Sequence, residues 1–193
     1  PPRDCMVDVA SQPDKVPAMS MVNGWPAAAE AGAPVRIPKG AAGDMLLLAS
    51  IWVASLFVVN PIGNFPLNDD WSFGLAVQRL LQTGQFHPAG WTSMPLITQA
   101  LWGSLFCLPA GFSFNALRAS TLVLSLGSVL IVYLLMRQVH PSRLLAAVAA
   151  LTLGFNPIYF ALSNTFMTDV PFTALLLASA WFFSRSLQNG SDF

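Results

Sequence analysis

Charged side chains are scarce in this 193-residue chain. Asp, Glu, Lys and Arg together make up 9% of it, whereas ordinary soluble domains contain about 25%. Hydrophobic residues make up 54%, and the mean hydropathy is +0.58. This composition excludes an ordinary soluble domain and indicates an integral membrane protein. The formal net charge is zero, so no excess of basic residues suggests nucleic acid as a partner.

Cysteine is rare as well. Cys5 and Cys107 lie far apart, and neither a CxxC motif nor a metal-ligand spacing occurs. The cysteines therefore carry no information about the compartment. A glycine-rich phosphate loop, an HExxH motif and a Ser/His/Asp pattern are also missing, which removes the common soluble-enzyme signatures.

The chain divides at about residue 43. Residues 1–43 are rich in Ala, Pro and Gly and lack apolar periodicity, so they predict a disordered cytoplasmic tail. Residues 44–193 predict an all-α polytopic membrane helix bundle, the N-terminal part of a longer membrane domain. Four apolar segments are close to the length needed to cross a ~30 Å hydrocarbon core. They cover about residues 45–62, 119–136, 144–162 and 170–184.

Two further features refine this bundle. Asn156-Pro157 predicts a kink in the third span, because proline removes one helical hydrogen bond. Residues 94–108 are apolar but short, and they contain Gln99. Segments of this kind are often interfacial. We therefore expect residues 94–108 to form a juxtamembrane helix that does not cross the membrane.

Basic residues set the orientation. Arg36 and Lys39 precede the first span, which places its start in the cytoplasm by the positive-inside rule. If residues 94–108 do not cross, Arg137 and Arg143 are also cytoplasmic. If they do cross, both arginines face outward, which the charge bias disfavours. The favoured topology places the loops after the first and third spans on the external side.

Acidic residues are almost absent from the apolar region. Between Met45 and Ser184 the acids are Asp69, Asp70 and Asp169, and the favoured topology places all three outside. A carboxylate kept at a bilayer is a functional candidate. The alternative is helix capping, since Asp suits a helix N-terminus. Asp69-Asp70 precedes an amphipathic segment, about residues 71–83, and Asp169 precedes Val170-Pro171 at the fourth span.

Two other polar residues are weaker candidates. Arg118 opens the second span and suits a phosphate, although arginine is equally common as an anchor at helix ends. His87 lies in the external loop, where a lone histidine is usually solvated.

These segments together resemble one family. They are NDDWSFGLAVQRLLQTGQFHPAGW (68–91), FNALRAS (114–120) and NTFMTDVPF (164–172). In this order they resemble the GT-C type polytopic glycosyltransferases of the protein O-mannosyltransferase-like family, which has the lipid A aminoarabinose transferases as relatives. The resemblance covers about residues 45–187. It implies that Asp69 is the catalytic base, with Asp70 and Asp169 in the same catalytic site, and it places an arginine, here Arg118, at the start of the next span. From their own chemistry and position, Arg118 and His87 are expected to contact the substrate.

The resemblance also implies a reaction. A polyprenyl-phosphate-linked sugar would be the donor, and an acceptor hydroxyl would displace the phosphate with inversion, assisted by one carboxylate base. The acceptor, whether protein, glycan or lipid, stays open. An arginine or a divalent cation would stabilise the leaving phosphate, and no ligand set is assigned for a metal. We expect the bacterial inner membrane, with the active site on its external face.

Two other functional classes fit the same composition. A transporter or channel would have acids within the spans, and none lies in the cores of the four spans. A non-catalytic membrane scaffold would use the three acids only as helix caps. Mutating the acids separates capping from catalysis.

Overall fold

The computed structural model describes residues 40–90 and 97–188. These residues form seven α-helices and no strand. Their bounds are α1 Ala41–Val59, α2 Asp70–Thr83, α3 Ile97–Cys107, α4 Phe114–Val139, α5 Arg143–Gly154, α6 Pro157–Ser163 and α7 Asp169–Gln188. The prediction of an all-α polytopic bundle is confirmed. The predicted tail lies outside the described residues, except for residues 40–43, of which 41–43 belong to α1.

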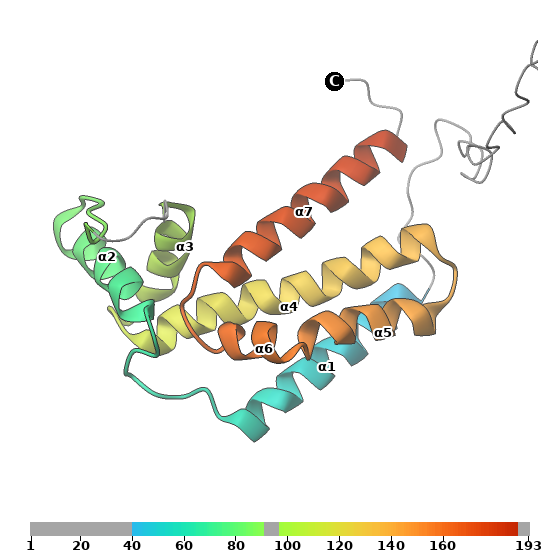
Figure 1. Ribbon diagram of the computed structural model, residues 1–193, viewed down its shortest axis with the longest axis horizontal. Helices are drawn as coiled ribbons and strands as arrows, with labels where there is room; N and C mark the ends of the chain where they lie inside the picture. Colours follow the sequence, from blue (N-terminus) through green and yellow to red (C-terminus); the bar gives the residue numbers. More distant parts are fainter. Residues whose placement is uncertain (1–39, 91–96, 189–193) are drawn as a thin grey trace, which may run out of the picture.

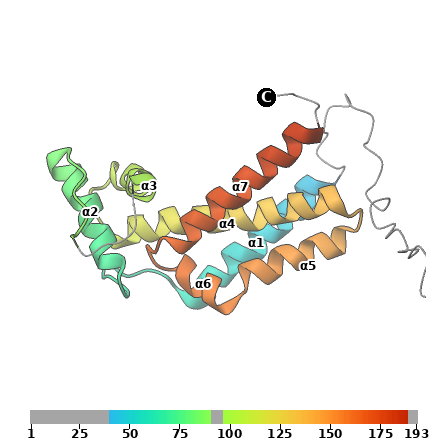
Figure 2. The ribbon, with the colours of Figure 1, turned by 45° about the horizontal axis from the view of Figure 1, so that its top comes forward.

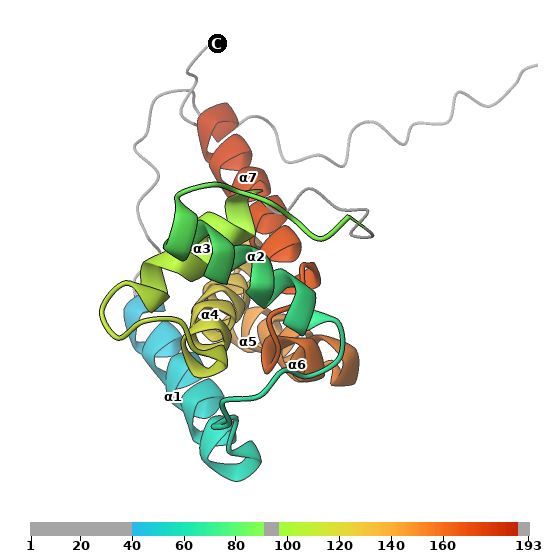
Figure 3. The same ribbon diagram turned by 90° about the vertical axis from the view of Figure 1, so that its left-hand side faces the viewer.

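Helix α4 is the centre of the bundle. Helices α1, α3, α5, α6 and α7 all pack on it, and α2 and α3 cover its N-terminal end (Figures 1 and 2). An end-on view shows α2 and α3 in front of the long helices (Figure 3). Ser113 caps α4 by accepting a hydrogen bond from the Ala116 N–H, and the 26-residue helix is about 39 Å long.

Within residues 40–90 and 97–188, three helices are long and apolar enough to cross a membrane: α1, α4 and α7. Helices α5 and α6 make a fourth span if the pair is taken as one, with a bend of 63° between them. This bend lies where Asn156-Pro157 predicts a kink. The Asn156 side chain caps α6 by accepting from the N–H groups of Ile158 and Tyr159, and Pro157 occupies the first turn.

Two short helices, α2 and α3, cover most of the residues expected to form juxtamembrane helices, and their position at the membrane stays a prediction. With 11 residues, α3 is about 16 Å long, well short of the ~30 Å hydrocarbon core. Residues 94–96, the start of the predicted segment, lie outside the described residues. Helix α2 ends at Gly84, whose φ of 69° is the left-handed conformation that glycine adopts without a Cβ clash.

The end of the first span differs from the expectation. The first span was expected to reach Ile62, but α1 ends at Val59. Asn60 takes a left-handed conformation (φ 49°) and donates its N–H to the Leu56 carbonyl at 2.8 Å. Pro61 then cannot continue the helix. The segment after α1 is therefore free to run back along the N-terminus of α4.

Candidate active site

The acidic pair lies at the start of α2, and its two members have opposite environments. Asp69 is exposed, whereas the Asp70 side chain is fully buried. Asp69 occupies the N-cap position, yet its side chain accepts no capping hydrogen bond. Its backbone carbonyl accepts from the N–H and hydroxyl of Ser72. The Asp69 carboxylate is thus left facing solvent, which capping alone does not explain.

The Asp70 carboxylate holds two backbone segments. Its Oδ1 accepts from the Leu67 N–H at 2.6 Å, and its Oδ2 accepts from the Phe166 N–H at 3.4 Å. Burial raises the pKa of Asp70 above its ordinary value, and these two N–H groups and the nearby Arg118 charge oppose that rise. A buried carboxylate needs such partners because isolated charge is costly in a low dielectric.

This second contact joins the two loops that the topology places together. Phe166 lies three residues before Asp169, the first residue of α7. Asp169 is exposed, and its backbone carbonyl accepts from the Thr173 hydroxyl. The loops carrying the three acids therefore lie at one end of the bundle. Direct approach of the Asp69 and Asp169 carboxylates stays a prediction.

Arg118 is buried, with 3% of its surface exposed. Its guanidinium donates to three carbonyls in the segment after α1: Pro61 at 2.9 Å, Gly63 at 2.7 Å and Phe65 at 2.5 Å. It also lies 5.2 Å from the centre of the Phe65 ring, a cation–π distance. Arg118 thus fixes the segment that leads to the acidic pair. Sequence periodicity contains no signal for these contacts.

The Arg118 guanidinium has a further donor, its Nε–H. The buried Nε–H of Arg118 has no hydrogen-bond partner within residues 40–90 and 97–188. The side chain lines a cavity of about 390 Å³ together with Pro61, Ile62, Asn115, Ala119 and Leu122. The expected substrate contact by Arg118 stays a prediction. His87 is exposed after the end of α2, and its role also stays a prediction.

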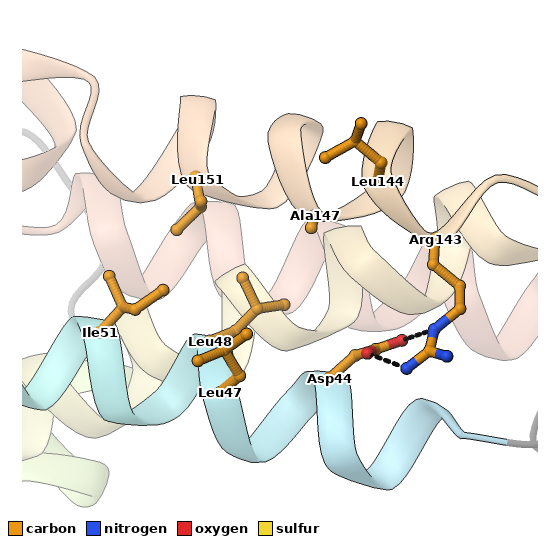
Figure 4. Close-up of a pocket in the computed structure, with 8 residues that line it drawn as sticks. All are labelled: Asp44, Leu47, Leu48, Ile51, Arg143, Leu144, Ala147 and Leu151. Atoms are coloured by element: carbon orange, nitrogen blue, oxygen red, sulfur yellow. Dashed lines mark hydrogen bonds and ion pairs between the residues drawn. The ribbon is translucent and has the colours of Figure 1, made fainter.

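The opposite end of the bundle has a charge pair that the sequence reasoning missed. Asp44 in α1 accepts hydrogen bonds from Arg143 of α5 and from the Tyr133 hydroxyl of α4. The pair lies at one end of a small apolar cavity of about 180 Å³ between α1 and α5 (Figure 4). Asp44 directly precedes the first apolar segment, and Arg143 directly precedes the third. A pair of opposite charges at these two positions is the sequence feature from which the contact could have been predicted.

Within the part of the chain that the structure describes, no three His, Cys, Asp or Glu side chains lie close enough to hold an ion together. The expected divalent cation stays a prediction.

The fold defines a polytopic helical membrane protein, and the loops carrying Asp69, Asp70 and Asp169 lie at one end of its bundle. Residues 93–193 match the dolichyl-phosphate-mannose-protein mannosyltransferase family, and this match covers just over half of the chain. The chain belongs to that family, which is of the GT-C glycosyltransferase type, and the resemblance expected from the sequence is confirmed. The matched residues include Arg118 and Asp169 and begin after the acidic pair. Neither a curated protein nor a solved structure matches the chain.

Proposed function

We propose that the chain is part of a membrane glycosyltransferase that moves a sugar from a polyprenyl-phosphate-linked donor to an acceptor hydroxyl with inversion. The observation that supports the proposal is the difference in environment between the two side chains of the acidic pair. Asp69 is exposed and forms no cap, while Asp70 is buried and bonded to two backbone N–H groups. An exposed carboxylate on a backbone that the adjacent buried residue anchors suits a base that must reach an external acceptor.

The reaction needs one such base. The acceptor oxygen attacks the anomeric carbon as its bond to the phosphate oxygen breaks, and the phosphate leaves with the bonding electrons. Asp69 accepts the hydroxyl proton during the attack. Phosphate is a good leaving group, so the reaction requires no second acid of the hydrolase kind. The lipid tail of the donor explains why the site belongs at a membrane surface.

Other residues have proposed supporting roles. Asp169 would orient the acceptor or the sugar, and Arg118 and His87 would contact the donor. A divalent cation on the phosphate is tested by chelation with EDTA followed by readdition of Mg²⁺ or Mn²⁺. We further propose that the membrane is the bacterial inner membrane and that the site faces outward. The sugar and the acceptor are not assigned.

The decisive experiment compares Asp69→Asn with Asp69→Ala in the full-length enzyme. A positioned base contributes about 10²–10⁴-fold, so both variants should lose at least about 100-fold in sugar transfer from a polyprenyl-phosphate donor. Their thermal unfolding should stay close to that of the wild type, because the side chain makes no capping bond. The capping alternative predicts an active Asp69→Asn and an unstable Asp69→Ala. An active Asp69→Asn enzyme would refute the base assignment.

A further inference from the structure

Both backbone polar groups of Phe166 are held by side chains from other helices. Its N–H donates to Asp70 of α2 at 3.4 Å. Its carbonyl accepts from the Gln99 side-chain amide of α3 at 2.9 Å. Phe166 lies between α6 and α7, so the two contacts tie α2, α3 and the turn before α7 together. We call these three residues the Phe166 clasp.

The Phe166 ring is fixed as firmly as its backbone. It is 1% exposed and packs in a core with Phe73, Val77 and Leu117. It also lies against Gly103 of α3, where an added Cβ would come within 2.6 Å of the ring. Such an approach is well inside van der Waals contact, so only glycine lets α3 and this ring lie so close. The turn before α7 therefore has little freedom to shift at Phe166.

Burial of the polar partners indicates a specific role. Asp70 is 0% and Gln99 5% exposed. Burying polar groups is costly unless they are bonded, and hydrophobic side chains would fill the same space at a lower cost. In this position the Asp70 carboxylate is closed to an external acceptor hydroxyl. Its geometry suits holding the backbone of a neighbouring loop.

The clasp links, by hydrogen bonds, the two segments that carry Asp69 and Asp169. Asp70 directly follows Asp69, and Phe166 precedes Asp169 by three residues, so Phe166 and Asp169 are at most about 11 Å apart along the chain. We propose that Gln99 is a positioning residue which, with Asp70, holds Asp169 at the mouth of the site carrying Asp69. The kinetic consequence of this role rests on the proposed function, whereas its geometric consequence does not.

The test replaces Gln99 in the full-length protein with methionine, which is similar in size but donates no hydrogen bond. The matched control is Gln82→Met, the same change at an exposed glutamine of α2. Spin labels at Arg79→Cys in α2 and Phe172→Cys in α7, both exposed, report the distance between the two helices. Cys5→Ser and Cys107→Ala remove the two thiols of this sequence, and any further cysteine of the full-length protein is replaced as well.

Gln99→Met should broaden or shift the distance distribution between the labels, and Gln82→Met should leave it unchanged. Without labels, Gln99→Met should lower kcat by about ten- to a hundredfold with little change in KM, since a misplacement of about 1 Å can cost about 10²-fold. A distance distribution identical to that of the wild type would overturn the clasp. If Gln99→Met changed the distance distribution but the wild-type protein had no transferase activity, the proposed function would be overturned and the clasp would stand.

Gln99→Glu gives a second test, which also applies if Gln99→Met does not fold. A protonated glutamic acid can donate to the Phe166 carbonyl, and an ionised one repels it. The label distances in Gln99→Glu should therefore resemble the wild type at acid pH and broaden as the pH rises. The wild type is measured at each pH as the control, because Asp70 also titrates. A distribution that still matches the wild type at about pH 10, above the pKa of about 8–9 that buried glutamates can reach, would again overturn the clasp.

Discussion

Asp44 and Arg143, 99 residues apart in the sequence, form an ion pair that joins α1 to α5. The Arg143 Nε donates to the Asp44 carboxylate at 2.7 Å, and a second guanidinium nitrogen also contacts it. The Tyr133 hydroxyl of α4 donates to the same carboxylate. One acid thus connects three helices at the end of the bundle opposite the candidate site.

This arrangement predicts coupling between the two charges. Asp44→Asn and Arg143→Gln should each lower the thermal unfolding temperature in detergent. The unfolding temperature of the double variant should fall by less than the sum of the two single decreases, because the second change removes a charge that is already unpaired. Arg79→Gln, at an exposed site on α2, is the control for losing an arginine. Strictly additive losses would show that the pair contributes nothing of its own.

The ion pair also bears on topology. Asp44 and Arg143 lie beside the turn between α4 and α5, whereas Asp70 meets the turn before α7. A bundle that crosses the membrane in the predicted way places these two ends on opposite sides. An impermeant maleimide should label Gln85→Cys in intact cells and label His140→Cys only after permeabilisation. External labelling of His140→Cys would overturn the predicted orientation.

Much of the fold could be predicted because it depends on local rules. Apolar length gives the long helices, Asn156-Pro157 gives the break between α5 and α6, and Gly84 gives the end of α2. The boundary at Asn60 was missed because a left-handed asparagine leaves no apolar signal.

The candidate site was predictable only in part. Its acids are conspicuous because acid is rare in the apolar region. Their partners are not, because contacts such as Gln99 with Phe166 join segments 67 residues apart through single hydrogen bonds. Neither helical periodicity nor charge balance specifies which backbone carbonyl a buried amide will meet.

Asp70 should make stability depend on pH. Burial raises its pKa above 3.8, its ordinary value. The folded state therefore binds the proton more tightly than the unfolded state, and the stabilisation from this group is complete below pH 3.8. It is lost as the pH rises through the raised pKa.

Asp70→Asn removes this titration while keeping the size of the side chain. The unfolding temperature of the wild type should therefore fall relative to that of Asp70→Asn as the pH increases from about 3.5. Asn68→Ala, which alters a neighbouring side chain without removing a carboxylate, should keep the wild-type slope. A difference between wild type and Asp70→Asn that is flat with pH, or that slopes the other way, would contradict the burial argument.

Arg118 offers the clearest separation of a structural from a substrate-binding role. Its guanidinium donates to three carbonyls of residues 61–65, and a hydrogen bond to a charged group contributes about 1.5–3 kcal/mol. Arg118→Met should therefore lower the free energy of unfolding by about 3 kcal/mol or more. Arg118→Lys should cost less, because an ammonium can still donate but cannot span all three carbonyls. Arg79→Lys, an exposed site, is the matched control.

Transfer kinetics then distinguish the two roles. If Arg118 only holds the 61–65 segment, Arg118→Lys should lower kcat and stability together, because the segment leads to Asp69, and leave the KM for the donor unchanged. If Arg118 also binds the donor phosphate, the KM should rise as well, since lysine lacks the planar fork that matches phosphate geometry. Full activity with wild-type stability in Arg118→Lys would exclude both roles, because the three carbonyl contacts would then be dispensable.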